Sequence, residues 1–457
     1  MKKIASLFSL VLVFCFCLSL ASCVQPGITG GNKTDFSESQ AKRVELRVWM
    51  DDDNGNLFSA IEADFEAKYR NIDLVFQHMA TVDAREKLKT YGQSGNGADI
   101  FQFPHDHMSQ AILDDLVYQL PDDLNAKLTA SMNPVAMDIA TVSYNDANKT
   151  FDPNGEEKLY AVPISLESVA LYYNIDLLKK IYGEEAWEAH ANPATFEEFL
   201  ADIAAYEPVV VEEGETPVMS DSHYFAQTSH WADQYMLQFI YSAFGWRPFG
   251  ANGNDDTAVG FEDAKLTSAL SWMMETLKPA INSTNADSVA GQSLFEQGLL
   301  PFVFTGPWCI QTFKNAGINF GVTTLPSING QATSTFAGAQ MLAAYKYSKN
   351  LDEATLFLEY MASVDAQTIL YQQEGDLPAL NEANLELIPG LAEDQPLQAT
   401  IEQLKTSIPM PTIPAVTYYW GPGETMVKNI WNSNASITEQ QGVAEDSYAA
   451  SKSQAQN

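Results

Sequence analysis

The sequence predicts an α/β fold, and three observations support this prediction. A strand-like alternation over residues 44–49 precedes apolar residues at helical spacing, from Leu57 to Tyr69. The same order of strand and helix then continues over residues 72–116. The chain has 457 residues, which is long enough to build two hydrophobic cores. We therefore expect sheets flanked by helices.

The local signals place each element in turn. Strands are predicted over Val44–Trp49, Ile72–Phe76 and Asp99–Phe103, and helices over Leu57–Tyr69, Val82–Tyr91 and Ser109–Leu116. Later signals predict an extended segment over Leu159–Asn174, a strand and helix over Leu299–Phe313, a helix over Leu351–Val364 and another after Pro422. Polar turns at residues 51–54 and 104–107 follow two of the strands, where α/β sheets bind their ligands.

The N-terminus predicts export. Lys2 and Lys3 precede an apolar run that ends in Leu20-Ala21-Ser22-Cys23 and resembles the processing box of bacterial lipoproteins. We expect a signal peptide over residues 1–22, a lipid anchor on Cys23 and a flexible tether over residues 23–43. The alternatives are an uncleaved membrane span and an ordinary secreted protein with a chance cysteine.

Composition excludes several classes of function. The formal net charge of −34 repels phosphate backbones, so we expect no nucleic-acid partner. Of the four cysteines only Cys309 lies in the body of the chain, so no disulfide is expected there. The sequence contains no GxSxG, Walker or GxGxxG motif, and we expect no cofactor.

Six segments of the chain carry a family resemblance. They are Val48-Trp49 with its acidic turn, Gly97–Phe101 leading into Pro104-His105-Asp106-His107, Tyr160–Asn174, Thr305-Gly306-Pro307-Trp308, Asn319–Pro326, and Pro409–Pro414 with Trp420. In this order they resemble the maltose/maltodextrin-binding proteins, which are solute receptors of carbohydrate ABC importers. Each segment alone is a weak signal, but six in order are specific.

The resemblance implies a two-lobed periplasmic-binding-protein fold of type II, in which each lobe is an α/β sheet flanked by helices. It places lobe 1 at residues 44–165 plus about 340–390, and lobe 2 at about 166–339 plus 391–457. Several chain crossings then form the hinge. No segment looks like a linker between domains in series, which agrees with this arrangement.

The implied function is binding rather than catalysis. The chain would capture a maltodextrin-type oligosaccharide by hinge closure and deliver it to the permease subunits of the importer. We expect an exported monomer that the lipid on Cys23 holds at the cell membrane, facing outside the cytoplasm.

A neutral oligosaccharide presents hydroxyl groups and apolar ring faces, so its receptor needs both carboxylates and aromatic rings. By the resemblance, Asp53 and Asp106 correspond to hydroxyl-binding carboxylates of lobe 1, Phe103 to an aromatic contact and Glu167 to a polar contact in the first hinge crossing. Alternatively, Asp53 is an acid at a helix N-terminus and Asp106 caps the helix after it. Glu167 lies in an apolar segment, where a charge is seldom buried without a partner.

The rings of lobe 2 complete the predicted site. Trp308 and Trp420 correspond to stacking residues of the family. Tyr235, two residues after Asp233, matches an acid and aromatic pair, and Trp231 competes with it for this role. Tryptophan is more often a core residue, which is the alternative for each of them.

Four positions depart from the family pattern. His107 stands where an arginine is frequent, Asn54 where a lysine is common, and Gly421 and Glu424 where tyrosine and arginine assist. These departures weaken the prediction of maltose itself and leave open a longer, cyclic or different oligosaccharide.

Two other functions compete with this interpretation. A secreted glycoside hydrolase needs a pair of carboxylates that flank the scissile bond, and no motif marks such a pair. A receptor for a polyamine or a peptide would also use an acidic site. A metal site has little support, because His105 and His107 are the only close histidines and no HExxH motif occurs.

Overall fold

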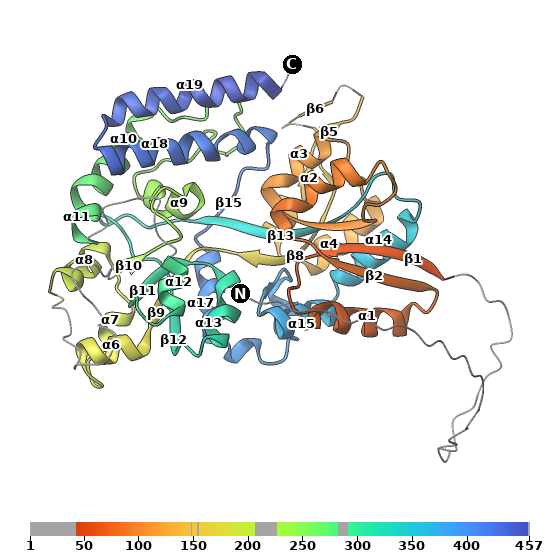
Figure 1. Cartoon of the computed structure of the whole chain (residues 1–457), viewed down its shortest axis with the longest axis horizontal. Helices are drawn as coiled ribbons and strands as arrows, with labels where there is room; N and C mark the ends of the chain where they lie inside the picture. The colour runs from red at the N-terminus through yellow and green to blue at the C-terminus, as the bar shows by residue number, and fades with distance from the viewer. Residues whose placement is uncertain (1–42, 148, 153–154, 206–225, 282–290, 456–457) are drawn as a thin grey trace, which may run out of the picture. The chain divides into compact units, whose positions relative to one another are not determined.

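Figure 1 shows a computed structural model of the chain. It describes residues 43–147, 149–152, 155–205, 226–281 and 291–455. The predicted signal peptide, Cys23 and all of the predicted tether except Arg43 lie outside the described residues. Residues Arg43–Asn457 form one compact unit. Across the described ranges, no helix combines the length and apolar character that a membrane span requires.

The first strands and helices follow the predicted order. Strand β1 (Val44–Met50) lies between β2 (Ile72–His78) and β3 (Ile100–Pro104) and runs parallel to both. Helices α1 (Asn56–Lys68) and α2 (Thr81–Tyr91) connect these strands. The buried face of α1 carries three of its predicted apolar residues, Leu57, Ile61 and Phe65. The predicted α/β alternation is therefore confirmed.

Strands from distant parts of the sequence extend this sheet. Strand β13 (Phe336–Ala344) runs antiparallel to β3 on one side and to β8 (Val162–Glu167) on the other. Strand β14 (Leu377–Pro378) pairs with β8, and β15 (Ile408–Pro409) pairs with the start of β13. The order is β14-β8-β13-β3-β1-β2, with β15 beside β13.

A second sheet has four strands in the order β10-β11-β9-β12. Strand β9 (Ala170–Asn174) is antiparallel to both β11 (Phe302–Thr305) and β12 (Phe320–Thr323). Strand β10 (Ala226–Gln227) is parallel to β11. Two further pairs of short strands are β4 (Thr141–Val142) with β7 (Lys158–Leu159) and β5 (Tyr144–Asn145) with β6 (Thr150–Phe151).

Helices surround the two larger sheets. Those that accompany the first sheet include α3 (Met108–Leu113), α4 (Asp122–Ser131), α5 (Pro134–Ala140), α14 (Leu351–Met361) and α15 (Val364–Glu374). Those near the second include α6 (Ile175–Tyr182), α7 (Glu188–Ala191), α8 (Phe196–Ala205), α9 (Gln234–Ala243), α10 (Ala264–Trp272), α11 (Lys278–Ala280), α12 (Gly291–Glu296), α13 (Ile310–Asn315) and α17 (Gln395–Leu404). Short helix α16 spans Glu382–Leu385.

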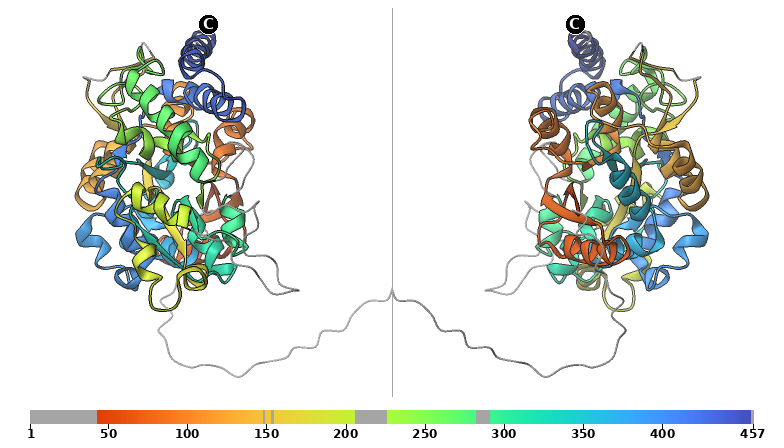
Figure 2. Two further views of the ribbon diagram at one scale, coloured as in Figure 1. Left: turned by 90° about the vertical axis from the view of Figure 1, so that its left-hand side faces the viewer. Right: turned by 90° about the vertical axis from the view of Figure 1, so that its right-hand side faces the viewer.

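The C-terminal helices α18 (Trp420–Ser433) and α19 (Ile437–Ala455) lie side by side in both views of Figure 2. Asn429 on α18 donates a hydrogen bond to Gln440 on α19. Helix α18 begins at Trp420, two residues before Pro422, so the predicted start after the proline is wrong. Proline is tolerated in a first turn because its missing N–H is unpaired there in any helix.

Three of the segments that lead between the regions of the two sheets come together at one point. Strand β8 continues into β9 through Ser168, Thr335 immediately precedes β13, and Ser407 immediately precedes β15. The hydroxyl groups of these three residues hydrogen-bond to one another, at oxygen separations of 2.7 to 3.1 Å. Two hydrophobic clusters, one around the first sheet and one around α9, α10 and α18, supply the cores. The exact residue boundaries of the two lobes remain a prediction.

Candidate ligand-binding site

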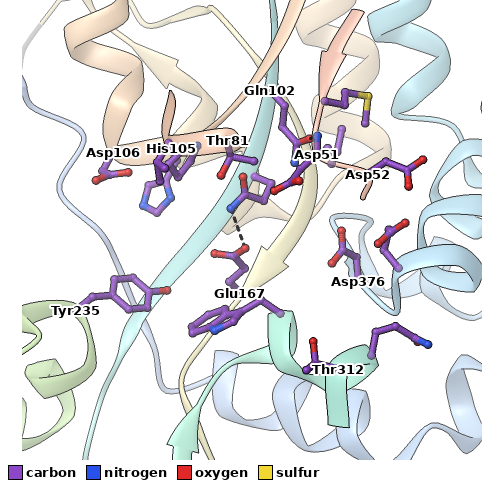
Figure 3. Close-up of a pocket in the computed structure, with 18 of the residues that line it drawn as sticks. Asp51, Asp52, Thr81, Gln102, His105, Asp106, Glu167, Tyr235, Thr312 and Asp376 are labelled. Atoms are coloured by element: carbon purple, nitrogen blue, oxygen red, sulfur yellow. Dashed lines mark hydrogen bonds between the residues drawn. The ribbon is translucent and has the colours of Figure 1, made fainter. Parts of the chain in front are cut away.

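A cavity of about 880 Å³ lies where the carboxyl ends of β1, β3 and β8 meet the N-termini of α9 and α18. Figure 3 shows carboxyl side chains, Tyr235 and amide groups directed into it from several elements. Six of the eight ligand contacts predicted from the sequence line this cavity: Asp53, Asp106, Glu167, Tyr235, Trp308 and Trp420.

Two roles were open for Asp53 in the turn after β1, a ligand contact and an acid at the helix N-terminus. In the structure its neighbour Asp52 takes the second role. Asp52 is only 4% exposed, and its carboxylate accepts the backbone N–H groups of Asn54, Gly55 and Phe58. Asp52 is therefore the acid that satisfies the N-terminus of α1. The side chain of Asp53 is 94% exposed at the cavity, 3.6 Å from His78, and is free to meet a ligand.

Asp106 follows β3 in the short 3₁₀ helix η1 (His105–His107). Neither η1 nor α3 has a side-chain hydrogen bond at its N-terminal cap, so the alternative role of Asp106 as a cap is not seen. Burial raises the pKa of Asp106 to about 6, although nearby backbone N–H groups and Trp420 favour its charged form. Asp106 is thus a partly desolvated acceptor in the wall of the cavity.

Glu167 ends β8 at the floor of the cavity. The amide nitrogen of Gln340, on β13, donates a hydrogen bond to Glu167 Oε1 at 3.0 Å (Figure 3). Burial, together with the nearby charge of Asp106, raises the pKa of Glu167 to about 7 despite this hydrogen bond. The Glu167 carboxyl group, which lies in the apolar segment, therefore has one amide partner. Its other oxygen, Oε2, faces Gly338.

Gly338 on β13 allows three polar side chains to converge. A Cβ atom at this position would lie 2.7 Å from Tyr235 Oη, 3.2 Å from His105 Cε1 and 3.5 Å from Glu167 Oε2. The backbone N–H of Ala339 donates to His105 Nδ1 at 3.0 Å and fixes the ring. Burial lowers the pKa of His105 to about 4, so the ring is neutral at pH 7.

Three aromatic rings line the cavity together with the carboxylates. Trp308 belongs to η3 (Pro307–Cys309) after β11, and its ring lies over Gly306, where a Cβ atom would come within 2.0 Å of it. The rings of Trp308 and Tyr235 have centroids 6.1 Å apart. Trp420 opens α18 with its ring centroid 4.9 Å from that of Tyr419. These partly buried rings leave apolar faces for a sugar.

Helix α9 positions Tyr235 through its cap. The Asp233 carboxylate accepts the backbone N–H groups of Tyr235 and Met236, which are in the first turn of the helix. Of the predicted acid and aromatic pair, Asp233 caps α9 and thereby positions the ring of Tyr235. Both residues line the cavity.

Two predicted contacts lie elsewhere, and we correct them. Phe103 is fully buried and packs against Phe101, because both faces of β3 are covered. Trp231 is 1% exposed and stacks on Trp431 in the second core, at a centroid separation of 6.1 Å. Neither ring lines the cavity. Between Tyr235 and Trp231, the structure favours Tyr235.

Sequence reasoning missed the acids at the end of α15. Glu374 and Asp376 line the cavity on either side of Gly375, which ends the helix with φ 76°. Burial and neighbouring carboxylates raise the pKa of each to about 7. The only signal was the Glu-Gly-Asp sequence after a helical pattern, and no motif links it to the turn at Asp51.

One group of side chains has the donor types of a metal site. Ligand atoms of Asp51, Asp53 and His78 lie within 4.8 Å of one another, and all three residues are exposed. His78 is 3.4 Å from Asp51 and 3.6 Å from Asp53. These contacts between the histidine ring and the two carboxyl groups account for the grouping without a metal.

The residues of this site lie in a chain that matches known proteins along most of its length. A model of the family described as bacterial extracellular solute-binding protein matches residues 60–399. A maltooligosaccharide ABC transporter solute-binding lipoprotein of Streptococcus pneumoniae (strain ATCC BAA-255 / R6) is 25% identical, over 87% of this chain and 86% of its own length. The galactooligosaccharide-binding protein of Bacillus subtilis (strain 168) is 26% identical, over 93% and 92%.

A solved structure agrees with these relatives. The crystal structure of a cyclo/maltodextrin-binding protein complexed with maltotetraose is similar with a TM-score of 0.71 and 25% identity, covering 91% of this chain and 98% of the other. The predicted fold class, a two-lobed periplasmic-binding-protein fold of type II, is confirmed by this similarity. Because the family model covers well over half of the sequence, the chain belongs to the family of bacterial extracellular solute-binding proteins.

Proposed function

We propose that this chain is the substrate-binding component of an ABC importer and captures a maltodextrin-type oligosaccharide in the cavity. The observation that carries the proposal is that one cavity is lined by both carboxyl groups and aromatic rings. Asp106 and Glu167 offer charge-assisted hydrogen bonds to hydroxyl groups, and the rings of Tyr235, Trp308 and Trp420 offer apolar faces to C–H groups.

The similar proteins support this ligand class. The names of the streptococcal and Bacillus relatives specify maltooligosaccharides and galactooligosaccharides, and the similar solved structure holds maltotetraose. A cavity of about 880 Å³ is within the range that encloses a ligand of several rings.

We propose binding without cleavage. A hydrolase needs one carboxyl group as acid and a second as base or nucleophile across the scissile bond. Glu167 is instead hydrogen-bonded to Gln340, and the charge of Asp106 acts on it as that of a neighbour in the lining of the same cavity. Product analysis after incubation with each sugar tests this part of the proposal.

We also propose that ligand binding closes two lobes about the three crossings. Asp53 and Asp106 precede the first crossing, whereas Trp308 follows it. A ligand that touches both groups favours the state in which they are close, by its differential affinity for that state. The permease subunits would recognise this closed state. An acylated Cys23 would hold the protein at the outer side of the cell membrane.

Titration calorimetry tests the assignment. Protein that starts at residue 24 is titrated with maltotetraose, maltopentaose, a galactooligosaccharide and a cyclic glucan. Saturable binding of one or more of these sugars, with no product formed, is expected. Cleavage, or binding of no sugar in the panel, would contradict the proposal.

A further inference from the structure

The cavity has an unusual charge composition. Nine of its lining side chains are carboxyl groups. Among the lining residues that the structure describes, none is lysine or arginine, and the histidines are His105 and His230. A neutral sugar requires hydrogen-bond acceptors and donors, but it does not require so many acids without a basic side chain among them.

Five of these acids interact with one another through their charges, and we call them the row: Asp106, Glu167, Asp376, Glu374 and Asp51. The charge of Asp106 acts on Glu167, that of Glu167 on Asp376, that of Asp376 on Glu374, and those of the turn at Asp51 on both of the last two. Each of these interactions raises the pKa of the affected carboxyl, so the groups oppose each other's ionisation.

Among the described residues, basic side chains act on this row at Asp106 and at Asp51. Arg85 acts on Asp106, but its guanidinium is bound to Asp114 at 2.9 Å. His78 acts on Asp51 from the exposed rim. Glu167, Glu374 and Asp376, in the middle of the row, have no basic side chain among the charges that shift their pKa values.

Two polar atoms beside the row indicate that a ligand completes it. His105 is 3% exposed, and its Nε2 has no hydrogen-bond partner among the described residues. His105 Nδ1 lies 3.0 Å from the nitrogen and 3.2 Å from the carbonyl oxygen of Ala339, so in either tautomer Nε2 requires a partner from the cavity that it lines (Figure 3). The Oε1 atom of Gln340, beside Glu167, likewise has no donor. Buried polar atoms of this kind are seldom left unpaired.

We propose that the preferred ligand is an oligosaccharide that bears protonated amino groups, placed along the row Asp106, Glu167, Asp376, Glu374 and Asp51. This inference rests on the proposed function and narrows its substrate class. An ammonium group donates three hydrogen bonds and supplies the charge that the row lacks, while a ring hydroxyl, which can both donate and accept, pairs with His105 Nε2. The aromatic wall accepts the same ring faces in an amino sugar as in a neutral one.

Two matched pairs of sugars test the inference by titration calorimetry. One is maltotetraose and its derivative with an amine at the reducing end, and the other is the β1,4-linked glucosamine tetramer and its N-acetylated form. The amine-bearing member of at least one pair is expected to bind tenfold or more tightly than its neutral partner. This gain should shrink at high salt, because the attraction is between charges.

Variants test whether the carboxyl groups of the row cause the tighter binding of the amine-bearing sugar. In the Glu374→Gln/Asp376→Asn variant the preference for the amine, measured as the ratio of the two affinities on the same variant, should fall to near one. The matched control is Glu62→Gln, which removes an exposed acid of α1 outside the cavity and should leave the preference unchanged. Circular dichroism shows whether each variant is folded.

The outcomes separate the two proposals. Equal or weaker binding of both amine-bearing sugars, with the neutral sugars bound, overturns the inference and leaves the proposed function standing. Binding of neutral sugar that requires added Ca²⁺ or Mg²⁺ also overturns it, because the metal would then be the cation. If no member of either pair binds, the inference fails, and the maltopentaose, galactooligosaccharide and cyclic glucan of the wider panel then decide whether the oligosaccharide assignment stands.

Discussion

The hydroxyl oxygens of Ser168 and Thr335 lie 2.7 Å apart, on two of the three segments that connect the sheets. Ser407, on the third, is hydrogen-bonded to both. The three crossings are therefore hydrogen-bonded to one another at one point. In the proposed closure, a rotation between the sheets would be centred on this point. Three polar groups that satisfy one another there let the backbone bend without exposing an unpaired donor.

Removing one member of this cluster should weaken both stability and closure. Ser168→Ala leaves the other two hydroxyls paired, so we expect the free energy of unfolding to fall by about 1 kcal/mol. Ser268→Ala, which removes an exposed hydroxyl bonded to Ala264, is the control and should change it little. Urea denaturation measures stability, and small-angle scattering with and without sugar measures compaction. A Ser168→Ala variant as stable as the control would show that the cluster does not secure the crossings.

The aromatic wall gives a second prediction. Trp308→Ala and Trp420→Ala should each weaken sugar binding by ~1–3 kcal/mol if the rings stack on sugar, by analogy with the loss of ring stacking on bases. Trp187→Ala, which removes a partly buried ring outside the cavity, is the control and should retain affinity. Titration calorimetry on folded protein measures each effect. Full affinity in the folded fraction of either variant would make that residue a core residue only.

Gly306 should matter through the ring that lies over it. In Gly306→Ala the new methyl group would meet the Trp308 ring at 2.0 Å, so the ring must move. We expect a loss of affinity similar to that of Trp308→Ala, and little additional loss in the double variant, because both changes act on one contact. Gly421→Ala adds a methyl group in open space and is the control. Additive losses would show that Gly306 acts on something other than the ring.

The pH dependence of stability follows from the acidic row. The pKa values of Glu167, Glu374 and Asp376 are raised to about 7, whereas in the unfolded chain such groups titrate near ~4. The folded protein then binds more protons between these values, so its stability falls as pH rises. The pKa values of His105 and His107 are lowered to about 4. Below roughly pH 6.5, where unfolded histidine becomes charged, these two residues make stability rise with pH and so oppose the effect of the acids.

The net fall is therefore expected between about pH 6.5 and 8 in the ligand-free protein. Thermal melts across this range should show a decreasing Tm. Asp376→Asn should flatten the dependence, because it removes one of the titrating groups and lessens the repulsion on Glu374. A Tm that rises with pH in this window would contradict the raised pKa values.

The lipid anchor can be tested on the intact cell. If Cys23 is acylated, Cys23→Ala should release the protein from the membrane fraction, since the remaining chain has no attached lipid. Fractionation followed by mass spectrometry of the mature N-terminus measures this. Membrane retention of a protein whose N-terminus carries no lipid would contradict the anchor.

The sequence alone predicts the local elements well and the site in part. Strand β1 and helix α1 are readable because their apolar residues repeat at strand and helix periods. Asp53 and Asp106 are proposed from the family resemblance, in turns that also follow strand ends. The resemblance likewise suggests Phe103 as a contact, but β3 is buried on both faces and its ring lies in the core. Asp376 is missed because only the pairing of β14 with β8 brings it to Glu167.

The same row of carboxyl groups also determines what the cavity rejects. Sugar phosphates and oligosaccharides that contain uronic acids would bring a negative charge next to Glu167, Asp376 and Glu374, where the described part of the chain supplies no lining lysine or arginine to pair with it. Within a mixture of released glycans, the protein would therefore select by repulsion as well as by attraction. Charge repulsion would therefore exclude anionic fragments even when their ring faces could stack on the aromatic residues.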